Sequence, residues 1–270
     1  IYAYLRRVAR DEGVTRRTMF RCELREAQWD AARAVWSVST SRGDLTADVL
    51  VAATGALSTP TYPKVPGLEL FRGKTFHSAE WDHDHDLTGE RVAVIGTGAS
   101  AIQFVPAIVD RVAHLTLFQR TASWVMPKHD PAIARSVRSL YRRFPFTQKL
   151  MRGAVYGQKE IYVVGMTKPF ARKYLLPLFE RRARQVLRKQ VQDPTLRERL
   201  TPDFAITCKR ILLSNEWFPT ITRSDVSVVS SGLTAVTENG VVDKDGNDSP
   251  VDTIIFGTGF TPTEPPVAHH

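Results

Sequence analysis

Short apolar runs alternate with polar segments rich in glycine and proline along the chain. Six runs carry strand signals: residues 47–53, 91–95, 114–119, 226–229, 241–242 and 251–256. Two less apolar stretches, residues 18–25 and 34–40, also favour strands, and the second leads into a turn signal at residues 41–44. No run approaches the ~18 apolar residues of a membrane-spanning helix, so the pattern predicts a soluble protein.

Other segments space their apolar residues as amphipathic helices do. These are residues 2–9, 102–109, 136–146, 169–189 and 195–200. The strand at 91–95, the helix at 102–109 and the strand at 114–119 follow one another directly, in the order of a βαβ unit. Because such units pair their strands in parallel, the sequence predicts an α/β fold with a parallel sheet.

Positive charge is concentrated in the second half of the chain. The formal net charge is +9, from 37 basic and 28 acidic residues. Residues 128–200 alone carry 18 lysines and arginines against 5 acidic residues, which is +13, so the rest of the chain carries −4. A helical cap with a solvated basic face explains this charge, and a surface for polyanions is the alternative. No nucleic-acid-binding motif accompanies the basic segment, so nucleic acid is not an expected partner.

A glycine-rich turn separates the predicted strand at 91–95 from the following helix. Its residues are Gly96-Thr97-Gly98-Ala99-Ser100-Ala101. The first glycine permits a tight turn, the second lets a pyrophosphate approach the backbone, and the small Ala101 lets the helix pack against the strand. The helix N-terminus adds unpaired amides and a partial positive charge. A structural glycine turn is the ordinary alternative, but the flanking strands and helix favour a dinucleotide site.

The second strand of this unit ends in Gln119-Arg120-Thr121 rather than in an acidic residue. A carboxylate about 20 residues after the glycines accepts from the ribose hydroxyls of NAD, whereas an arginine there suits the extra phosphate of NADP. Arg120, with Thr121 beside it, therefore predicts NADPH rather than NADH. A surface arginine at a strand end is the alternative.

Residues 71–82 form a motif of five defined positions upstream of the glycine turn. They read Phe71-Arg72-Gly73-Lys74-Thr75-Phe76-His77-Ser78-Ala79-Glu80-Trp81-Asp82. Taken alone, His77 is an ordinary core or surface histidine and Trp81 a packing aromatic. The pattern F-x-G-x-x-x-H-x-x-x-W-D resembles the fingerprint of Baeyer-Villiger monooxygenases. These class B flavoproteins insert oxygen beside a ketone carbonyl.

The resemblance implies a Rossmann-like flavoprotein with two dinucleotide-binding domains, FAD and NADPH as cofactors, and a helical insertion in the NADPH domain. It implies that NADPH reduces FAD, that oxygen forms a flavin peroxide, and that the peroxide attacks a ketone or soft heteroatom to give an ester or lactone from a ketone. His77 and Trp81 then belong to the catalytic machinery. Arg210 would steady the anionic peroxide and Lys209 would approach the NADPH phosphate. The strand ends at Thr54, Gly55 and Gly259 match places where the chain passes between the cofactor domains.

By the same resemblance, residues 1–90 belong to an FAD-binding domain that includes the linker motif. Residues 91–245 form the NADPH-binding domain, with the helical insertion at about 128–203, and residues 246–270 return to the FAD-binding domain. No G-x-G-x-x-G precedes Gly96, and the family's long C-terminal portion has no counterpart. The chain therefore resembles an internal fragment of such an enzyme. An N- or S-oxygenating flavin monooxygenase and a non-catalytic NADPH-binding fragment are the alternatives.

Cysteine and histidine usage adds two further expectations. Cys22 and Cys208 cannot form a disulfide framework and no signal peptide is evident, which predicts a cytoplasmic protein. The segment Asp82-His83-Asp84-His85-Asp86 offers metal-ligating side chains, but no further ligands lie near it in sequence. We interpret it as a polar loop and expect no metal.

Overall fold

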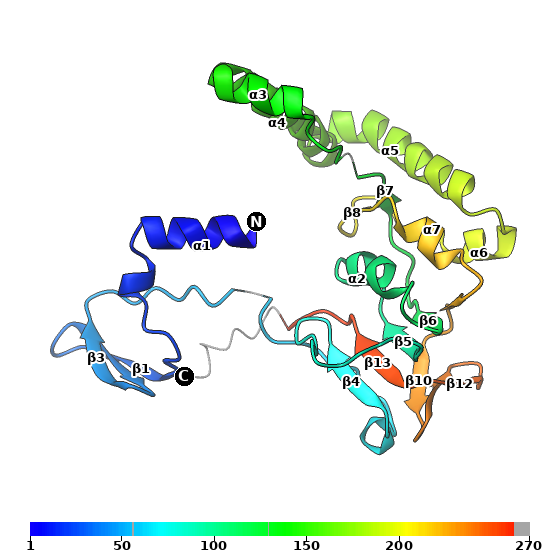
Figure 1. The fold of residues 1–270 in the computed structure, drawn as a ribbon, viewed down its shortest axis with the longest axis horizontal. Coiled ribbons are helices and arrows are strands. Elements are labelled where there is room, and N and C mark those ends of the chain that lie inside the picture. The colour runs from blue at the N-terminus through cyan, green and yellow to red at the C-terminus, as the bar shows by residue number, and fades with distance from the viewer. Residues whose placement is uncertain (56, 129, 262–270) are drawn as a thin grey trace. The chain divides into compact units, whose positions relative to one another are not determined.

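The computed structural model describes residues 1–55, 57–128 and 130–261, and the chain divides into two compact units. The first unit comprises Ile1–Pro60 and the chain from Phe260 onward, and the second comprises Thr61–Gly259. Figure 1 shows the elements of both. The predicted return segment at 246–270 is therefore described only as far as residue 261.

The first unit holds one helix and a small antiparallel sheet. The expected helix is present as α1 (Tyr2–Asp11), followed by a 3₁₀ turn (Thr15–Arg17). Strands β1 (Leu24–Asp30), β2 (Val35–Thr40) and β3 (Gly43–Ala47) pair in that order, and the predicted turn at 41–44 joins β2 to β3. Near its end, Thr261 N–H donates to the Thr59 carbonyl at 3.0 Å.

Two strand predictions in this unit are wrong. The strand expected at 18–25 begins only at Leu24, because its register is set by pairing with β2. The run at 47–53 is not a strand after Ala47, and the side chains of Val49 and Val51 are 75% and 78% exposed. Within the described residues this run forms no ladder with another strand, so its apolar side chains have no sheet to cover them.

The second unit is built on a five-stranded parallel sheet. Its order is β4 (Lys74–His77), β13 (Thr253–Phe256), β5 (Arg91–Ile95), β6 (His114–Phe118) and β9 (Val226–Val229). All four neighbouring pairs are parallel. The predicted α/β class with a Rossmann-like parallel sheet is confirmed, and apolar side chains of β5, β6 and β13 are almost completely buried.

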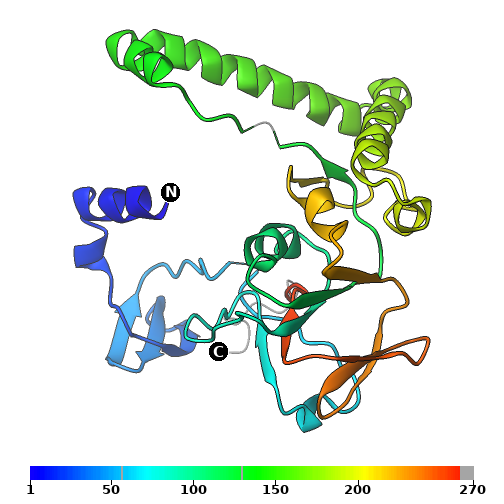
Figure 2. The ribbon, with the colours of Figure 1, turned by 45° about the vertical axis from the view of Figure 1, so that its right-hand side comes forward.

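Two hydrophobic clusters contact this sheet. One joins β5 and β6 to the helices α2 (Ala101–Ile108) and α7 (Trp217–Ile221). The other joins Ile254 and Phe256 to a small antiparallel sheet. That sheet contains β10 (Leu233–Val236), β11 (Gly240–Asp243) and β12 (Asp248–Pro250). The 3₁₀ turn Leu68–Leu70 packs beside it, and Figure 2 shows the sheet from a second direction. The central strands are therefore buried on both faces, which is why they read as continuous apolar runs.

The basic segment is helical, as predicted. It contains α3 (Arg135–Arg143), α4 (Pro145–Thr167), α5 (Pro169–Gln190) and α6 (Pro194–Arg199). Helix α4 was not predicted, although its apolar residues are segregated no less clearly than those of the predicted α5. At Gly165 a Cβ atom would lie 3.0 Å from Leu175 Cδ1, so the small residue permits close contact between α4 and α5. Short strands β7 (Val125–Met126) and β8 (Leu212–Leu213) frame the segment.

The compact units have their own boundaries, and the division into cofactor domains expected at residues 90 and 246 stays a prediction. Strand β4, from the linker motif, and strand β13 both hydrogen-bond within the same sheet as β5. This pairing places residues 61–90 and 246–259 in the second unit. No helix in the described part of the chain is long and apolar enough to cross a membrane.

Candidate dinucleotide and oxygen-transfer site

The glycine turn (residues 96–101) is fixed by backbone contacts at the carboxyl end of β5. The Gly96 N–H donates to the Phe118 carbonyl at 3.0 Å, and the Gly257 N–H donates to the Ile95 carbonyl at 2.8 Å. Gly96 has φ +110°, and a Cβ atom there would lie 2.5 Å from the Gly257 carbonyl oxygen. Glycine is therefore required at position 96 by the packing of the protein backbone itself.

The next residues of the turn face open space. Gly98 and Ala99 are exposed, and a Cβ atom on Gly98 would meet no atom within 4 Å. The first i to i−4 hydrogen bond of α2 runs from the Ile102 N–H to the Gly98 carbonyl at 3.1 Å. Amides that precede this bond have no acceptor within the helix and carry its partial positive charge. The turn therefore has the form of an anion-binding helix N-terminus.

The loop that follows β6 lies against the same turn. The Thr97 hydroxyl donates to the Thr121 carbonyl at 3.4 Å, and the Ser123 hydroxyl to the Thr97 carbonyl at 3.5 Å. Gln119 is buried, and its side chain donates to the Arg199 carbonyl at 2.9 Å. Arg120 between them is exposed to solvent. The structure thus brings the Thr121 backbone against the glycine turn, and the assignment of Arg120 to the coenzyme phosphate stays a prediction.

Arg210 meets the glycine turn from a distant part of the sequence. It lines a depression of about 570 Å³ together with Ala99, Ile102 and Gln103 from the turn and α2. Lys128 and Asp130 also line it and form an ion pair at 2.6 Å, which lowers the pKa of the Asp130 carboxyl. Arg210 itself is exposed.

Lys209 points elsewhere. Its ammonium nitrogen lies 4.6 Å from the centre of the Phe204 ring, a cation–π contact, and it is not among the residues that line the Arg210 depression. Of the adjacent pair Lys209 and Arg210, only the arginine is therefore placed beside the turn.

His77 is buried at the carboxyl end of β4. The Ala79 N–H donates to His77 Nδ1 at 3.1 Å, and the ring lies edge-on to Tyr62 at 5.6 Å. Burial lowers the pKa of His77 below its ordinary 6.5, although Glu80 and a backbone hydrogen bond to Gly259 act in the opposite direction. Because Nδ1 accepts a hydrogen bond, the neutral ring carries its proton on Nε2.

Tyr62 and Glu80 form a polar pair beside His77. The Tyr62 hydroxyl donates to Glu80 Oε2 at 2.8 Å, and the Tyr62 ring also lies edge-on to Phe256 at 5.4 Å. Burial, followed by the hydrogen bond to Glu80, raises the pKa of Tyr62. This pair therefore holds a negative carboxylate close to the neutral imidazole.

Trp81 is a packing residue in this structure. Its ring contacts Phe76 of β4 at 5.1 Å and Phe104 of α2 at 5.4 Å, both edge-on. It is partly buried against the core cluster that contains α2. Trp81 therefore connects the linker motif to the helix that follows the glycine turn, without lying among the residues that line the Arg210 depression.

The three remaining cofactor candidates, Thr54, Gly55 and Gly259, are divided between the two units. In the first unit, Gly55 has φ +78°, its carbonyl accepts from the Ser58 hydroxyl at 3.3 Å, and Thr54 is exposed beside it. In the second unit, Gly259 has φ +85°, and its carbonyl accepts from the Thr61 N–H at 3.0 Å. A Cβ atom added to Gly55 or to Gly259 would meet no other atom within 4 Å, so there is free space beside the backbone of each glycine.

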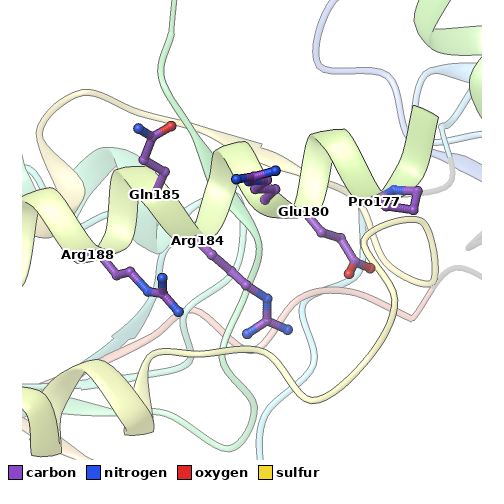
Figure 3. A pocket seen from close by; sticks show the side chains of 6 residues that line it. Pro177, Glu180, Arg184, Gln185 and Arg188 are labelled. Atoms are coloured by element: carbon purple, nitrogen blue, oxygen red, sulfur yellow. The ribbon is translucent and has the colours of Figure 1, made fainter. Parts of the chain in front are cut away.

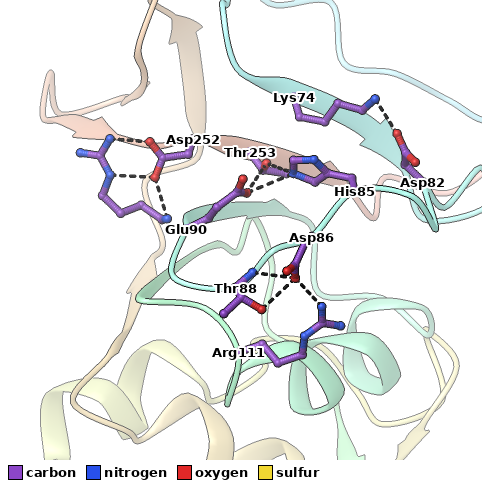
Figure 4. A network of polar contacts seen from close by, with 10 residues as sticks. Lys74, Asp82, His85, Asp86, Thr88, Glu90, Arg111, Asp252 and Thr253 are labelled. Atoms are coloured by element: carbon purple, nitrogen blue, oxygen red, sulfur yellow. Dashed lines mark hydrogen bonds and ion pairs between the residues drawn. The ribbon is translucent and has the colours of Figure 1, made fainter.

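Figure 4 shows how the acidic segment after the linker motif is used. Asp82 pairs with Lys74 at 2.5 Å and Asp86 with Arg111 at 2.7 Å. His85 Nε2 lies 3.1 Å from Glu90 Oε2 and 2.9 Å from the Thr253 hydroxyl. In the described ranges no group of three or more histidine, cysteine or acidic side chains could hold a metal ion. These side chains connect the loop to the edges of the sheet.

Sequence reasoning missed part of this site. Gly257 supplies the carbonyl that excludes a side chain at Gly96, and the repeated Gly-Thr-Gly at 96–98 and 257–259 is the signal that could have found it. Gln103, Lys128 and Asp130 line the Arg210 depression, and nothing in their local sequence marks them.

Comparison with known proteins agrees with this architecture. The family model described as pyridine nucleotide-disulphide oxidoreductase matches residues 2–161, so the chain belongs to that family. The particular relatives are monooxygenases. A Baeyer-Villiger monooxygenase of Streptomyces coelicolor is 48% identical over 268 residues, which cover 99% of this chain and 51% of the relative. One of Pseudomonas aeruginosa is 47% identical over 266 residues, covering 98% and 50%.

The solved structures that resemble this chain are also monooxygenases. Cyclohexanone monooxygenase from Rhodococcus sp. Phi1 bound to NADP+ has a TM-score of 0.80 at 25% identity, covering 96% of this chain and 55% of that one. Oxidized steroid monooxygenase bound to NADP has a TM-score of 0.80 at 29% identity, covering 96% and 56%. The chain spans about half the length of the curated relatives it matches.

Proposed function

We propose that the chain forms the NADPH-binding part, with adjoining segments, of an FAD-dependent Baeyer-Villiger monooxygenase. Such an enzyme inserts one atom of O₂ beside a ketone carbonyl to give an ester or lactone. The observation that carries the proposal is the meeting of the glycine turn, the Arg120 loop and Arg210 in one unit. The names of the 47–48% identical relatives support the same reaction class.

NADPH fits the open part of the glycine turn. Gly98 leaves space where a pyrophosphate can approach the backbone, and the amides that precede the Ile102 hydrogen bond offer donors and positive charge. Thr121 contacts the turn through Thr97, and the neighbouring Arg120 suits the additional phosphate of NADPH. Lys209 is a further candidate for that phosphate once its contact with Phe204 is released. The cofactors named for the solved relatives, NADP and FAD, agree with these assignments.

In the first unit, the exposed Thr54 and Gly55 support FAD binding, because a Cβ position on Gly55 has no atom within 4 Å. In the second unit, Gly259 is supported separately by the same open Cβ position. When bound, the flavin supplies hydride acceptance and the activation of O₂. We assign residues 91–245 to the NADPH side, with the insertion at about 128–203. Residues 1–90 and the described part of 246–270 are assigned to the flavin side.

Within the site, Arg210 is the residue proposed to stabilise developing negative charge. An arginine keeps its charge at working pH, and a fixed guanidinium favours an oxyanion formed on the ketone away from bulk water. His77 is kept neutral by burial and holds a proton on Nε2 at the strand end beside Gly257 and Gly259. Trp81 holds α2, and with it the glycine turn, against β4. His77 and Trp81 are therefore proposed to shape the site.

The proposed partners are a small ketone or heteroatom substrate and O₂, with neither nucleic acid nor a membrane. The free thiols of Cys22 and Cys208 support a cytoplasmic location, where cysteines stay reduced.

Coenzyme titration tests the binding part of this proposal. Purified chain is titrated with NADPH and NADH by fluorescence, and Arg120→Ala is expected to weaken NADPH by about tenfold or more while changing NADH by less than about twofold. Arg138→Ala on α3 is the matched control, because Arg138 is exposed and lies outside the residues of the turn and depression. Equal losses for both coenzymes contradict the assignment of Arg120.

Turnover tests the reaction. Protein supplied with FAD, NADPH and O₂ is incubated with a cyclic ketone and with a thioether, and the products are identified by mass spectrometry. Arg210→Ala is expected to lower ester formation by about 10²-fold or more with little change in NADPH affinity. A protein that oxidises the thioether and never the ketone is an S-oxygenating enzyme instead. Normal ester formation by Arg210→Ala contradicts the role of Arg210.

A further inference from the structure

Helix α5 carries a groove that the proposed reaction does not use. Its volume is about 570 Å³, and its lining residues are Pro177, Glu180, Arg181, Arg184, Gln185 and Arg188. Figure 3 shows Glu180, Arg184 and Arg188 leaving the same side of the helix. None of these residues lines the Arg210 depression. The groove is therefore a separate feature of the second unit.

Three guanidinium groups are gathered along one stripe of α5. Arg181, Arg184 and Arg188 are spaced i, i+3 and i+7, so at 3.6 residues per turn they fall within an arc of about 60°. At 1.5 Å per residue they extend over about 10 Å of the helix axis. Like charges at this spacing repel and destabilise an isolated helix. Arg172 and Arg182 lie outside this arc, on other sides of α5.

The structure does not neutralise this stripe. Across residues 1–55, 57–128 and 130–261, none of the ion pairs involves Arg181, Arg184 or Arg188. Glu180, the one acidic residue in the lining, accepts the Ile206 N–H at 3.1 Å through Oε1. Its carboxylate is thereby held toward the 204–206 segment, and the three arginines leave a net positive groove.

One of the three arginines is already held in place. The Arg184 guanidinium lies 5.1 Å from the centre of the Trp124 ring, and Trp124 is buried with its indole N–H donating to the Phe204 carbonyl at 2.8 Å. Arg184 is half-buried, whereas Arg181 and Arg188 are exposed. A guanidinium fixed over a rigid ring loses less conformational entropy when it binds an anion.

We propose that this groove binds a small anion with two or more linked phosphate groups. A planar guanidinium matches phosphate oxygens through paired hydrogen bonds, and three of them in a row match several phosphates rather than one. The stripe is confined to one helix face and is about 10 Å long, which favours a small ligand over a nucleic acid. The inference does not depend on the proposed oxygenation, because it uses no residue of that site.

Calorimetric titration of the full 270-residue chain with inorganic tripolyphosphate at about 50 mM salt tests the proposal. The Gly98→Ala variant is titrated in parallel, because its added methyl group lies in the open part of the glycine turn, and binding that it retains reports a site away from that turn. Arg184→Gln and Arg188→Gln are each expected to weaken binding by about fivefold or more. The matched control is Arg172→Gln, which removes the same charge from the opposite face of α5 and is expected to change binding by less than about twofold.

Circular dichroism of each variant checks that α5 stays folded, and the conservative Arg184→Lys variant separates loss of charge from loss of paired hydrogen bonding. Lys at this position keeps the charge but is expected to recover only part of the affinity. Equal losses for Arg172→Gln and Arg184→Gln indicate attraction by net charge alone and overturn the proposal. So does the absence of tripolyphosphate binding, or binding that is lost in Gly98→Ala.

Discussion

The clearest physical test of the glycine turn is a comparison of its two glycines. Gly96→Ala introduces a methyl group at φ +110°, with the new carbon 2.5 Å from the Gly257 carbonyl oxygen and 3.0 Å from its carbonyl carbon. Both neighbours are backbone atoms at the end of β13 and cannot rotate away as a side chain could. The strand ends of β5 and β13 must therefore separate.

The expected cost has two parts. Holding a non-glycine residue at such a backbone conformation costs about 1–3 kcal/mol. Forcing an additional carbon into a packed backbone contact costs about 1–3 kcal/mol more. The loss in free energy of unfolding is thus about 2–6 kcal/mol. For a unit of about 200 residues this lowers Tm by at least about 4 °C.

Gly98→Ala is the matched control, because its new methyl group meets no protein atom within 4 Å and the residue has no positive φ. Removing glycine from such a position leaves stability unchanged or raises it by up to about 1 kcal/mol. The same methyl group occupies the space proposed for the pyrophosphate, so NADPH affinity is expected to fall by about fivefold or more.

Thermal and urea unfolding by circular dichroism measure the stability of both variants, and fluorescence titration measures NADPH affinity. The two variants are expected to differ in both measurements. Gly96→Ala has a lower Tm than the parent, whereas Gly98→Ala keeps its Tm and binds NADPH more weakly. A Gly96→Ala protein that melts within about 1 °C of the parent would refute the backbone argument. A Gly98→Ala protein with unchanged NADPH affinity would refute the placement of the dinucleotide.

Two other residues of the linker motif give separate predictions. Trp81→Ala removes the edge-on contacts with Phe76 and Phe104 and is expected to lower the free energy of urea unfolding by about 2–4 kcal/mol. Trp81→Phe keeps an aromatic ring and should lose less than half of that amount. Equal losses for the two variants would contradict the packing role. Burial lowers the pKa of His77 below 6.5, so below that pH the unfolded chain binds the proton more readily than the folded protein does. The free energy of unfolding is therefore highest above pH 6.5 and decreases as the pH falls below 6.5. Urea unfolding between about pH 7.5 and 5.5 should show a smaller decrease for His77→Gln than for the parent, and identical pH profiles would exclude His77 as the cause.

Local sequence was sufficient where residues interact with their neighbours in the chain. The bounds of three elements were predicted almost to the residue: the strand at 91–95, the helix after the glycine turn and the strand at 114–119. Each is long enough for the spacing of its apolar residues to indicate a strand or a helix. The contact of Thr121 with the turn follows from the same unit. Helix α4 was missed, and its apolar pattern does not account for this, because the predicted α5 has no clearer apolar stripe.

Long-range pairing decided the rest. The apolar run at 47–53 reads as a buried strand, yet strand formation needs a partner ladder, and within the described residues it has none beyond Ala47. The sheet instead inserts β13, from near the end of the described chain, between β4 and β5. No local pattern specifies that order, because hydrogen bonds between strands depend on which edges meet in the folded chain.

The sequence by itself therefore determined which functional groups are present in each local segment. These are a glycine turn ahead of a helix, an arginine after the next strand, and the linker motif with His77 and Trp81. Only the tertiary structure decided which side chains and backbone atoms contact one another. It placed Arg210 beside the turn and Lys209 on Phe204, and it made Trp81 a packing residue. It also required glycine at position 96 through a carbonyl 161 residues away in the chain. Residue type fixes charge, size and hydrogen-bonding capacity, whereas contact between distant residues exists only once the strands have paired.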